Sequence, residues 1–166
     1  QAVEAVHAAY IDSGANVITS NSYAVVPFHI GEARFAQEGQ ALAALAGELA
    51  RRAVQASGKA VQVAGSLPPL FGSYRPDLFQ AERVSELLTP LVNGLAPHVD
   101  LWLAETQSSI AEARAIHAGL PKDGKPFWLS FTLKDEDTDE VPRLRSGEPV
   151  ADAAEAAAQL GVQVLL

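Results

Sequence analysis

Apolar residues along the chain follow two alternating patterns, one with the period of a helix and one with the continuous runs of a buried strand. Stretches with apolar positions three or four residues apart predict helices at 1–15, 39–58, 81–96, 108–120 and 150–161. Short runs rich in Val, Leu and Ile predict strands buried on both faces at 17–22, 61–65, 99–104, 127–132 and 162–166. This alternation favours right-handed crossovers and a parallel sheet.

Two of the predicted helices have features that the structure can test, an apolar face in the first and a proline in the third. The apolar face of the first helix consists of Val3, Val6, Ala9 and Tyr10. The third helix contains Pro90, which lacks the amide hydrogen that a helix interior needs, so we expect an interruption near this residue.

Polar side chains follow the predicted strands at their carboxyl ends, in the stretches SNSY, GSLPP, AETQ and SFTL. A parallel barrel builds its active site at that end of its strands. No strand is followed by the G-x-G-x-x-G pattern of a dinucleotide-binding fold. We therefore predict that 1–166 is a single partial domain, an internal segment of a TIM (β/α)8 barrel holding about strands 2–6. An open sheet is the alternative.

Composition and charge narrow the classes of partner. Of the 166 residues, 48% are apolar and 19% are charged, with a formal net charge of −8, as in an ordinary globular domain. Because Lys and Arg form no cluster, neither nucleic acid nor an anionic membrane is an expected partner. No apolar run reaches membrane-spanning length and no signal peptide is recognisable, so a cytoplasmic location is expected.

Cysteine and methionine are both absent. These residues therefore provide neither a disulfide nor a thiolate metal site. The chain begins in a helical pattern and ends in a strand pattern, so we expect an internal stretch of a longer protein. The histidines, none of which has the spacing of a metal-binding pair, are His7, His29, His98 and His117. The acidic run 134–149 lacks the spacing of a calcium loop and is predicted to be a solvated loop over the barrel mouth.

Four blocks in order along the chain resemble the homocysteine S-methyltransferase family. They are SGANVITSNSYA (13–24), AGSLPPLFGSYRPDLF (64–79), HVDLWLAETQ (98–107) and FWLSFTLKDED (127–137). The chain departs from the family pattern where SNS replaces TNT and where Pro68 replaces a glycine. The resemblance implies a zinc-dependent barrel methyltransferase (EC 2.1.1 class) that forms methionine from homocysteine and a methyl donor. The Zn²⁺ would be held by thiolates that lie outside these residues.

Glu105 is the acid that the sequence places at the carboxyl end of a buried strand. The ammonium group of homocysteine is costly to bury unless it meets an anion and hydrogen-bond acceptors. A carboxylate aimed into the barrel mouth would supply that anion, and the family resemblance favours this role for Glu105. The alternative is a structural one, in which Glu105 caps the following helix or pairs with an arginine.

Small polar residues at two other strand ends are further candidates for substrate binding. Ser20, Asn21 and Ser22 lie at the end of the first predicted strand, and Ser66 directly follows the second. Their hydroxyl and amide groups are suited to orienting the amino-acid head of a substrate, although Ser and Asn are also common in turns. No residue of the chain is assigned as catalytic or as a metal ligand.

Two other functions stay open at this point. One is a different barrel enzyme, such as a lyase or aldolase, that uses Glu105 as general acid or base. The other is a catalytically inactive relative. The methyl donor is equally open, with S-methylmethionine, S-adenosylmethionine, betaine and methylfolate as candidates.

Overall fold

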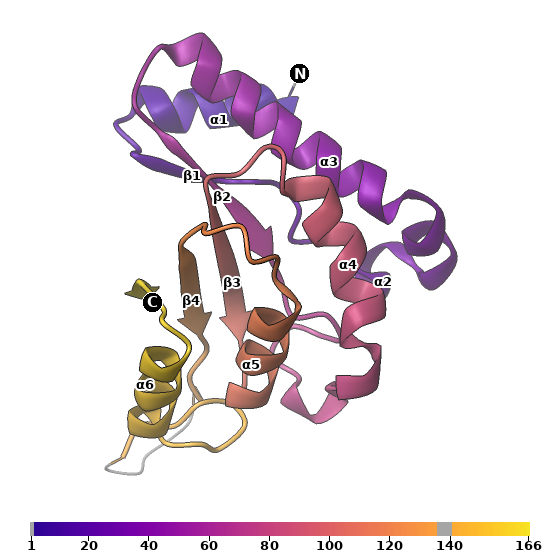
Figure 1. Ribbon diagram of the computed structural model, residues 1–166, viewed down its shortest axis with the longest axis vertical. Coiled ribbons are helices and arrows are strands. Elements are labelled where there is room, and N and C mark those ends of the chain that lie inside the picture. Colours follow the sequence, from indigo (N-terminus) through magenta and orange to yellow (C-terminus); the bar gives the residue numbers. More distant parts are fainter. Residues whose placement is uncertain (1, 136–140) are drawn as a thin grey trace.

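Five parallel strands follow one another across a single sheet in the same order as along the chain (Figure 1). The computed structural model describes residues 2–135 and 141–166. The strands are β1 (Val17–Thr19), β2 (Gln62–Leu67), β3 (Leu101–Gln107), β4 (Phe127–Phe131) and β5 (Val164–Leu165). Every neighbouring pair is parallel, which confirms the predicted parallel sheet.

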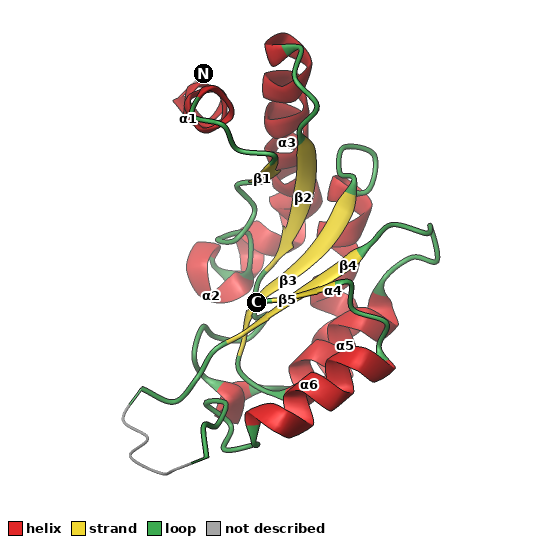
Figure 2. Cartoon of the chain, turned by 90° about the vertical axis from the view of Figure 1, so that its left-hand side faces the viewer, coloured by secondary structure: helices red, strands yellow, loops and turns green. Residues whose placement is uncertain are grey.

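Most of the helices lie along one face of this sheet, and the first of them lies beside the edge formed by β1 (Figure 2). The helices are α1 (Ala2–Asp12), α2 (Pro27–Ile30), α3 (Glu32–Ser57), α4 (Val84–Leu95), α5 (Ile110–Gly119) and α6 (Val150–Gln159). Two short 3₁₀ turns, η1 (Pro76–Leu78) and η2 (Ala81–Arg83), precede α4. The main hydrophobic cluster joins these helices to the sheet, whereas a second cluster on the other face contains residues of strands alone. Sequential parallel strands with helices on one face form the arc of a barrel rather than a doubly wound sheet.

The expected interruption of a helix at Pro90 is wrong, because α4 continues through this residue. Leu87, Leu88 and Leu91 are at most 1% exposed and anchor the helix on both sides of the proline. The fixed φ of proline suits a helix, and the carbonyl that loses its partner is that of Glu86. Glu86 lies on the exposed side of α4, where water can hydrogen-bond to the carbonyl.

The apolar face predicted for the first helix is not a buried face. In α1, His7 and Ile11 are buried, whereas Val6 is 54% and Tyr10 is 64% exposed. The helix packs on α3 and β1 through its Ile11 side, so the Val6 and Tyr10 side faces a cavity next to β1. None of the described helices is both long and apolar enough to cross a bilayer.

Candidate functional site

Alternation along β3 decides which way its side chains point. Trp102 and Ala104 pack among the helices, whereas Leu101 and Leu103 belong to the strand-only cluster on the opposite face. Successive side chains of a strand point to opposite faces. Glu105 therefore shares the face of Leu101 and Leu103, which in a barrel is the interior.

A chain of serine hydroxyls links the ends of β1 and β2 to Glu105. The hydroxyl of Ser66, which is fully buried, donates a hydrogen bond to the carboxylate of Glu105. The backbone nitrogen of Ser66 donates to the Ser20 hydroxyl at 3.0 Å, and the Ser20 and Ser22 hydroxyls lie 2.9 Å apart. The Ser22 hydroxyl in turn donates to the Ser66 carbonyl at 2.9 Å. These contacts hold the carboxyl ends of the two strands together beside Glu105.

Each hydroxyl proton of this chain is already used within the protein. Ser22 gives its only hydroxyl proton to the Ser66 carbonyl, so the proton between Ser20 and Ser22 belongs to Ser20. Ser66 gives its proton to Glu105. An ionised carboxylate offers about four acceptor positions, so Glu105 retains capacity for a donor from outside the protein.

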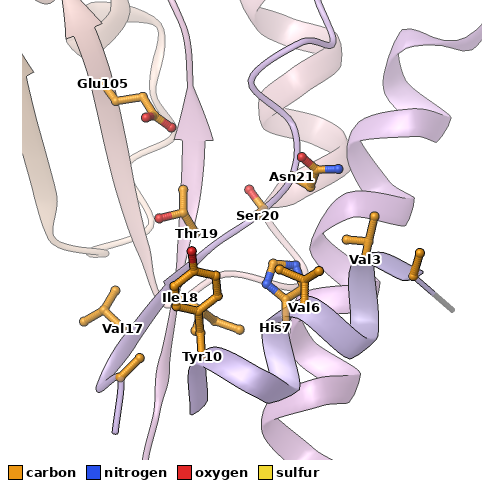
Figure 3. Close-up of a pocket in the computed structure, with 12 residues that line it drawn as sticks. Val3, Val6, His7, Tyr10, Val17, Ile18, Thr19, Ser20, Asn21 and Glu105 are labelled. Atoms are coloured by element: carbon orange, nitrogen blue, oxygen red, sulfur yellow. The ribbon is translucent and has the colours of Figure 1, made fainter. Parts of the chain in front are cut away.

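A cavity of about 660 Å³ opens beside this chain of serines. Figure 3 shows Glu105, Thr19, Ser20 and Asn21 on one side of it and the residues of α1 on the other. The lining is mixed, with polar groups at the strand ends and apolar groups from α1. Because β1 is an edge strand of the sheet, the cavity is open along this edge, and the part of its lining that could meet a charged ligand is the strand ends with Glu105 and Ser20.

The structure brings four of the five predicted binding residues into one connected group. Ser20 and Glu105 line the cavity, and Ser66 contacts the Glu105 carboxylate directly. Ser22 belongs to the same group but has no exposed surface, so its contacts support the neighbouring serines. Asn21 lines the cavity without being hydrogen-bonded into the group.

The structural roles considered for Glu105 are filled by other residues. The amino end of α5 is capped by Ser109, whose hydroxyl accepts from the Glu112 backbone nitrogen at 3.1 Å. The carboxylate of Glu112 accepts from the backbone nitrogen of Ser108 at 2.8 Å. Within the described residues, Glu105 is paired with no arginine, lysine or histidine. Its carboxylate is thus available as an anionic acceptor at the cavity.

Glu112 is a buried acid that the sequence analysis did not single out. Only 3% of the residue is exposed, and this burial raises the pKa of its carboxyl. The S-x-x-E spacing of Ser109 and Glu112 is the signal that could have identified it, since this is the pattern of a capping box.

The loop after β4 is held against the strand ends over the part that the structure describes. Arg145 lies over the ring of Tyr74, 4.7 Å from its centroid, and forms an ion pair with Asp135. The backbone nitrogen of Arg145 donates to the Thr132 carbonyl at 3.1 Å. Part of the predicted solvated loop, 136–140, lies outside the described residues.

The described residues do not fit a zinc ion. No group of three or more His, Asp or Glu side chains within 2–135 and 141–166 is arranged to hold a metal, and the chain has no cysteine. The nearest histidine to the cavity is His7, and burial lowers the pKa of its imidazole. A catalytic zinc ion needs three converging protein ligands, which the described part of the chain does not supply.

Comparison with known proteins gives a consistent picture. The family model described as homocysteine S-methyltransferase matches residues 1–166. The homocysteine methyltransferase MmuM from Escherichia coli is similar in its oxidised form, with 27% identity and a TM-score of 0.79. Its metallated form gives 29% identity and the same TM-score of 0.79. Each match covers 98% of this chain and 60% of the MmuM chain. A search among curated proteins gave no match.

A more distant solved structure shares the fold alone. A putative phosphonomutase from Burkholderia cenocepacia J2315 is 18% identical with a TM-score of 0.57, over 98% of this chain and 54% of that one. Together with the MmuM structures, this match identifies the five-stranded arc as part of a (β/α)8 barrel, as the sequence predicts. The chain spans 60% of the length of the MmuM chain that it matches.

Proposed function

Since this chain belongs to the homocysteine S-methyltransferase family, we propose that it is part of an enzyme that transfers a methyl group to the thiol of homocysteine and forms methionine. The observation that supports this proposal most directly is the environment of the Glu105 carboxylate. This carboxylate lies at the cavity, is oriented by Ser66, and has no cationic partner among the described residues. A partly buried carboxylate without a cationic partner is suited to bind an ammonium group.

In the proposed complex, the substrate ammonium takes the acceptor positions of Glu105 that Ser66 leaves free. The Ser66 hydroxyl restricts the rotation of the carboxylate, so Glu105 meets the ligand in one orientation. Asn21 lines the same cavity and offers an amide donor to the substrate carboxylate, whereas Ser20, whose hydroxyl proton is used, can only accept a hydrogen bond. Fixing one reactant in this way lowers the entropic cost of methyl transfer.

Activation of the thiol is not assigned to this chain. A free thiol has a pKa of about 8.5, so most homocysteine is protonated at neutral pH and some group must favour the thiolate. The described residues contain no cluster that could bind zinc. The proposal therefore places the zinc implied by the resemblance on residues outside this chain, and no step of catalysis is derived through it.

The proposal also includes the partners and location expected from composition. The substrates are small molecules, homocysteine and one methyl donor, and the net charge of −8 disfavours nucleic acid and anionic membranes. The proposed location is the cytoplasm, and none of the described helices is long and apolar enough to span a membrane.

The experiment that tests the function is methyl transfer by the full-length protein with a matched pair of thiols. Methionine formation is followed by mass spectrometry with each of the four candidate donors. The control acceptor is 4-mercaptobutyrate, which keeps the thiol and carboxylate of homocysteine but lacks its ammonium. We expect turnover of homocysteine with at least one donor and little turnover of the control. A protein that binds homocysteine but transfers no methyl group from any donor would be an inactive relative, and the proposed activity would be wrong.

A further inference from the structure

The carboxyl end of β3 departs from regular pairing with β4. Ala104 pairs with Leu129 and Gln107 pairs with Phe131, so the interval on β3 is one residue longer than that on β4. Within this interval Thr106 has a φ of 63°. A β-branched residue rarely adopts this left-handed conformation, which crowds its side chain against the backbone. The extra residue forms a β-bulge, a feature that commonly re-aims a side chain beside an active site.

The bulge sends Glu105 and Gln107 to opposite faces of the sheet. In a regular strand, two residues that are two positions apart point to the same side. Glu105 does line the cavity beside β1, and it follows Leu103 of the strand-only cluster by two positions. Gln107, however, is fully buried on the helix side, where it lies with Phe79 and Ile116. Its pairing partner Phe131 packs on that side too.

The side chain of Gln107 stabilises the bulge from the helix side of the sheet. Its side-chain nitrogen donates to the carbonyl of Glu105 at 2.9 Å and to that of Leu67 at 3.4 Å. Its own carbonyl accepts from the backbone nitrogen of Thr132 at 2.8 Å. One side chain thus connects the carboxyl ends of β2 and β3, and its backbone connects β3 to the segment after β4. The bond to the Glu105 carbonyl fixes the peptide that carries the candidate binding acid.

Burying the amide of Gln107 at this position is energetically unfavourable. Its side-chain oxygen is buried and has no hydrogen-bond partner among the described residues. A buried polar atom without a partner destabilises a fold, and leucine would fill the same space without that cost. The side-chain nitrogen, with its bond to the Glu105 carbonyl, is the part of the amide that accounts for a glutamine here.

We propose that Gln107 is a positioning residue for substrate binding, acting through Glu105. The hydrogen bond from its amide to the Glu105 carbonyl stabilises the β-bulge at Thr106. The bulge in turn directs the Glu105 carboxylate toward Ser66 and the cavity. This inference rests on the proposed function, in which Glu105 receives the ammonium of homocysteine.

The test compares Gln107→Leu and Gln107→Met with the parent in the full-length protein. Both variants remove the donor to the Glu105 carbonyl and nearly keep the side-chain volume. Loss of one such bond is expected to weaken homocysteine binding about tenfold by calorimetry. The KM for the methyl donor should stay unchanged. If neither variant folds, Gln107 belongs to the fold alone and the inference is wrong.

A double-mutant cycle decides whether Gln107 acts through Glu105. In a Glu105→Gln background, Gln107→Leu should change homocysteine affinity by less than about twofold, because the group that it positions is already gone. An equal loss in both backgrounds would overturn the inference, as would an unchanged affinity in Gln107→Leu alone. If Glu105→Gln alone leaves homocysteine affinity intact, the role proposed for Glu105 fails first, and the role of Gln107 fails with it.

Thr106→Gly supplies the matched control. Glycine adopts a positive φ without strain, so this variant keeps the bulge while removing the neighbouring side chain. We expect homocysteine affinity within about twofold of the parent and a higher melting temperature, because the strain at Thr106 is relieved. A loss of affinity as large as that of Gln107→Leu would assign the effect to the Thr106 side chain and overturn the role of Gln107.

Discussion

Replacing Glu105 by glutamine is the sharpest perturbation of the candidate site. The change removes the negative charge and keeps the shape of the side chain. The glutamine oxygen can still accept the hydrogen bond that Ser66 donates. What is lost is the charge that the ammonium of homocysteine would meet, so the variant separates binding from folding.

The expected magnitude follows from the burial of the pair. Breaking a fully buried ion pair costs about 3–5 kcal/mol, and an exposed pair contributes less than about 1 kcal/mol. Glu105 is partly buried and would be covered further by a ligand in the cavity. The low end of the buried range, about 3 kcal/mol, corresponds to a loss of affinity on the order of a hundredfold.

The assay is calorimetric titration of homocysteine into the full-length parent and Glu105→Gln, together with thermal melting of each. We expect the affinity to fall about a hundredfold while the unfolding free energy changes by about 1 kcal/mol or less. Binding of 4-mercaptobutyrate, which has no ammonium, should not weaken. Unchanged homocysteine binding with a sharp fall in melting temperature would show that Glu105 is structural and refute the reasoning.

Glu148→Gln is the matched control for this experiment. Glu148 is also partly buried and also accepts a hydrogen bond from a serine hydroxyl, that of Ser146. It accepts from the backbone nitrogen of Ile110 at 3.0 Å, and it does not line the cavity. The same chemical change at this position should leave homocysteine affinity at the parent value.

Two further predictions concern the stability of the fold. A Cβ added to Gly94 would lie 2.5 Å from the Gln40 carbonyl oxygen on α3, so Gly94→Ala should lower the unfolding free energy by about 1–3 kcal/mol in urea titrations. An unchanged value would mean that α3 and α4 are not in this close contact. Burial raises the pKa of Glu112 above its ordinary 4.5 in the folded chain, so its stabilising contribution is complete below 4.5 and is lost as the pH rises through the folded pKa. The parent should therefore gain stability relative to Glu112→Gln on acidification, and a difference that is constant with pH would contradict this.

The fold was predictable because its strands and helices have unlike patterns. Val63 to Gly65 and Leu101 to Leu103 are stretches without a polar side chain, and both become parts of strands that are covered on both faces. The path of α4 through Pro90 was not predictable, since a local rule about proline competes with the burial of the leucines around it. Whether a helix continues through a proline depends on tertiary packing, and the hydrophobic pattern of one helix does not show how that helix packs.

The candidate site was predictable to the level of residues at strand ends, but not to the level of their contacts. The position of Glu105 after an apolar strand, together with the family resemblance, identified it as a candidate. Its partner Ser66 and the bulge at Thr106 depend on the register between neighbouring strands. A register cannot be read from one strand alone, and a shift of one residue moves a side chain to the other face of the sheet.

The irregular end of β3 links the fold to the proposed chemistry. A regular strand would place Glu105 and Gln107 on the same face and bring both into the barrel interior. The extra residue in β3 instead leaves Glu105 as the polar group of β3 that faces the cavity, while Gln107 joins the surrounding strand ends from the helix side. The strained backbone of Thr106 thus lies between Glu105 and Gln107, at the point where these two side chains turn to opposite faces of the sheet. On this reasoning, the structure around Glu105 limits the motion of its carboxylate before any substrate arrives, which lowers the entropy lost when an ammonium group binds.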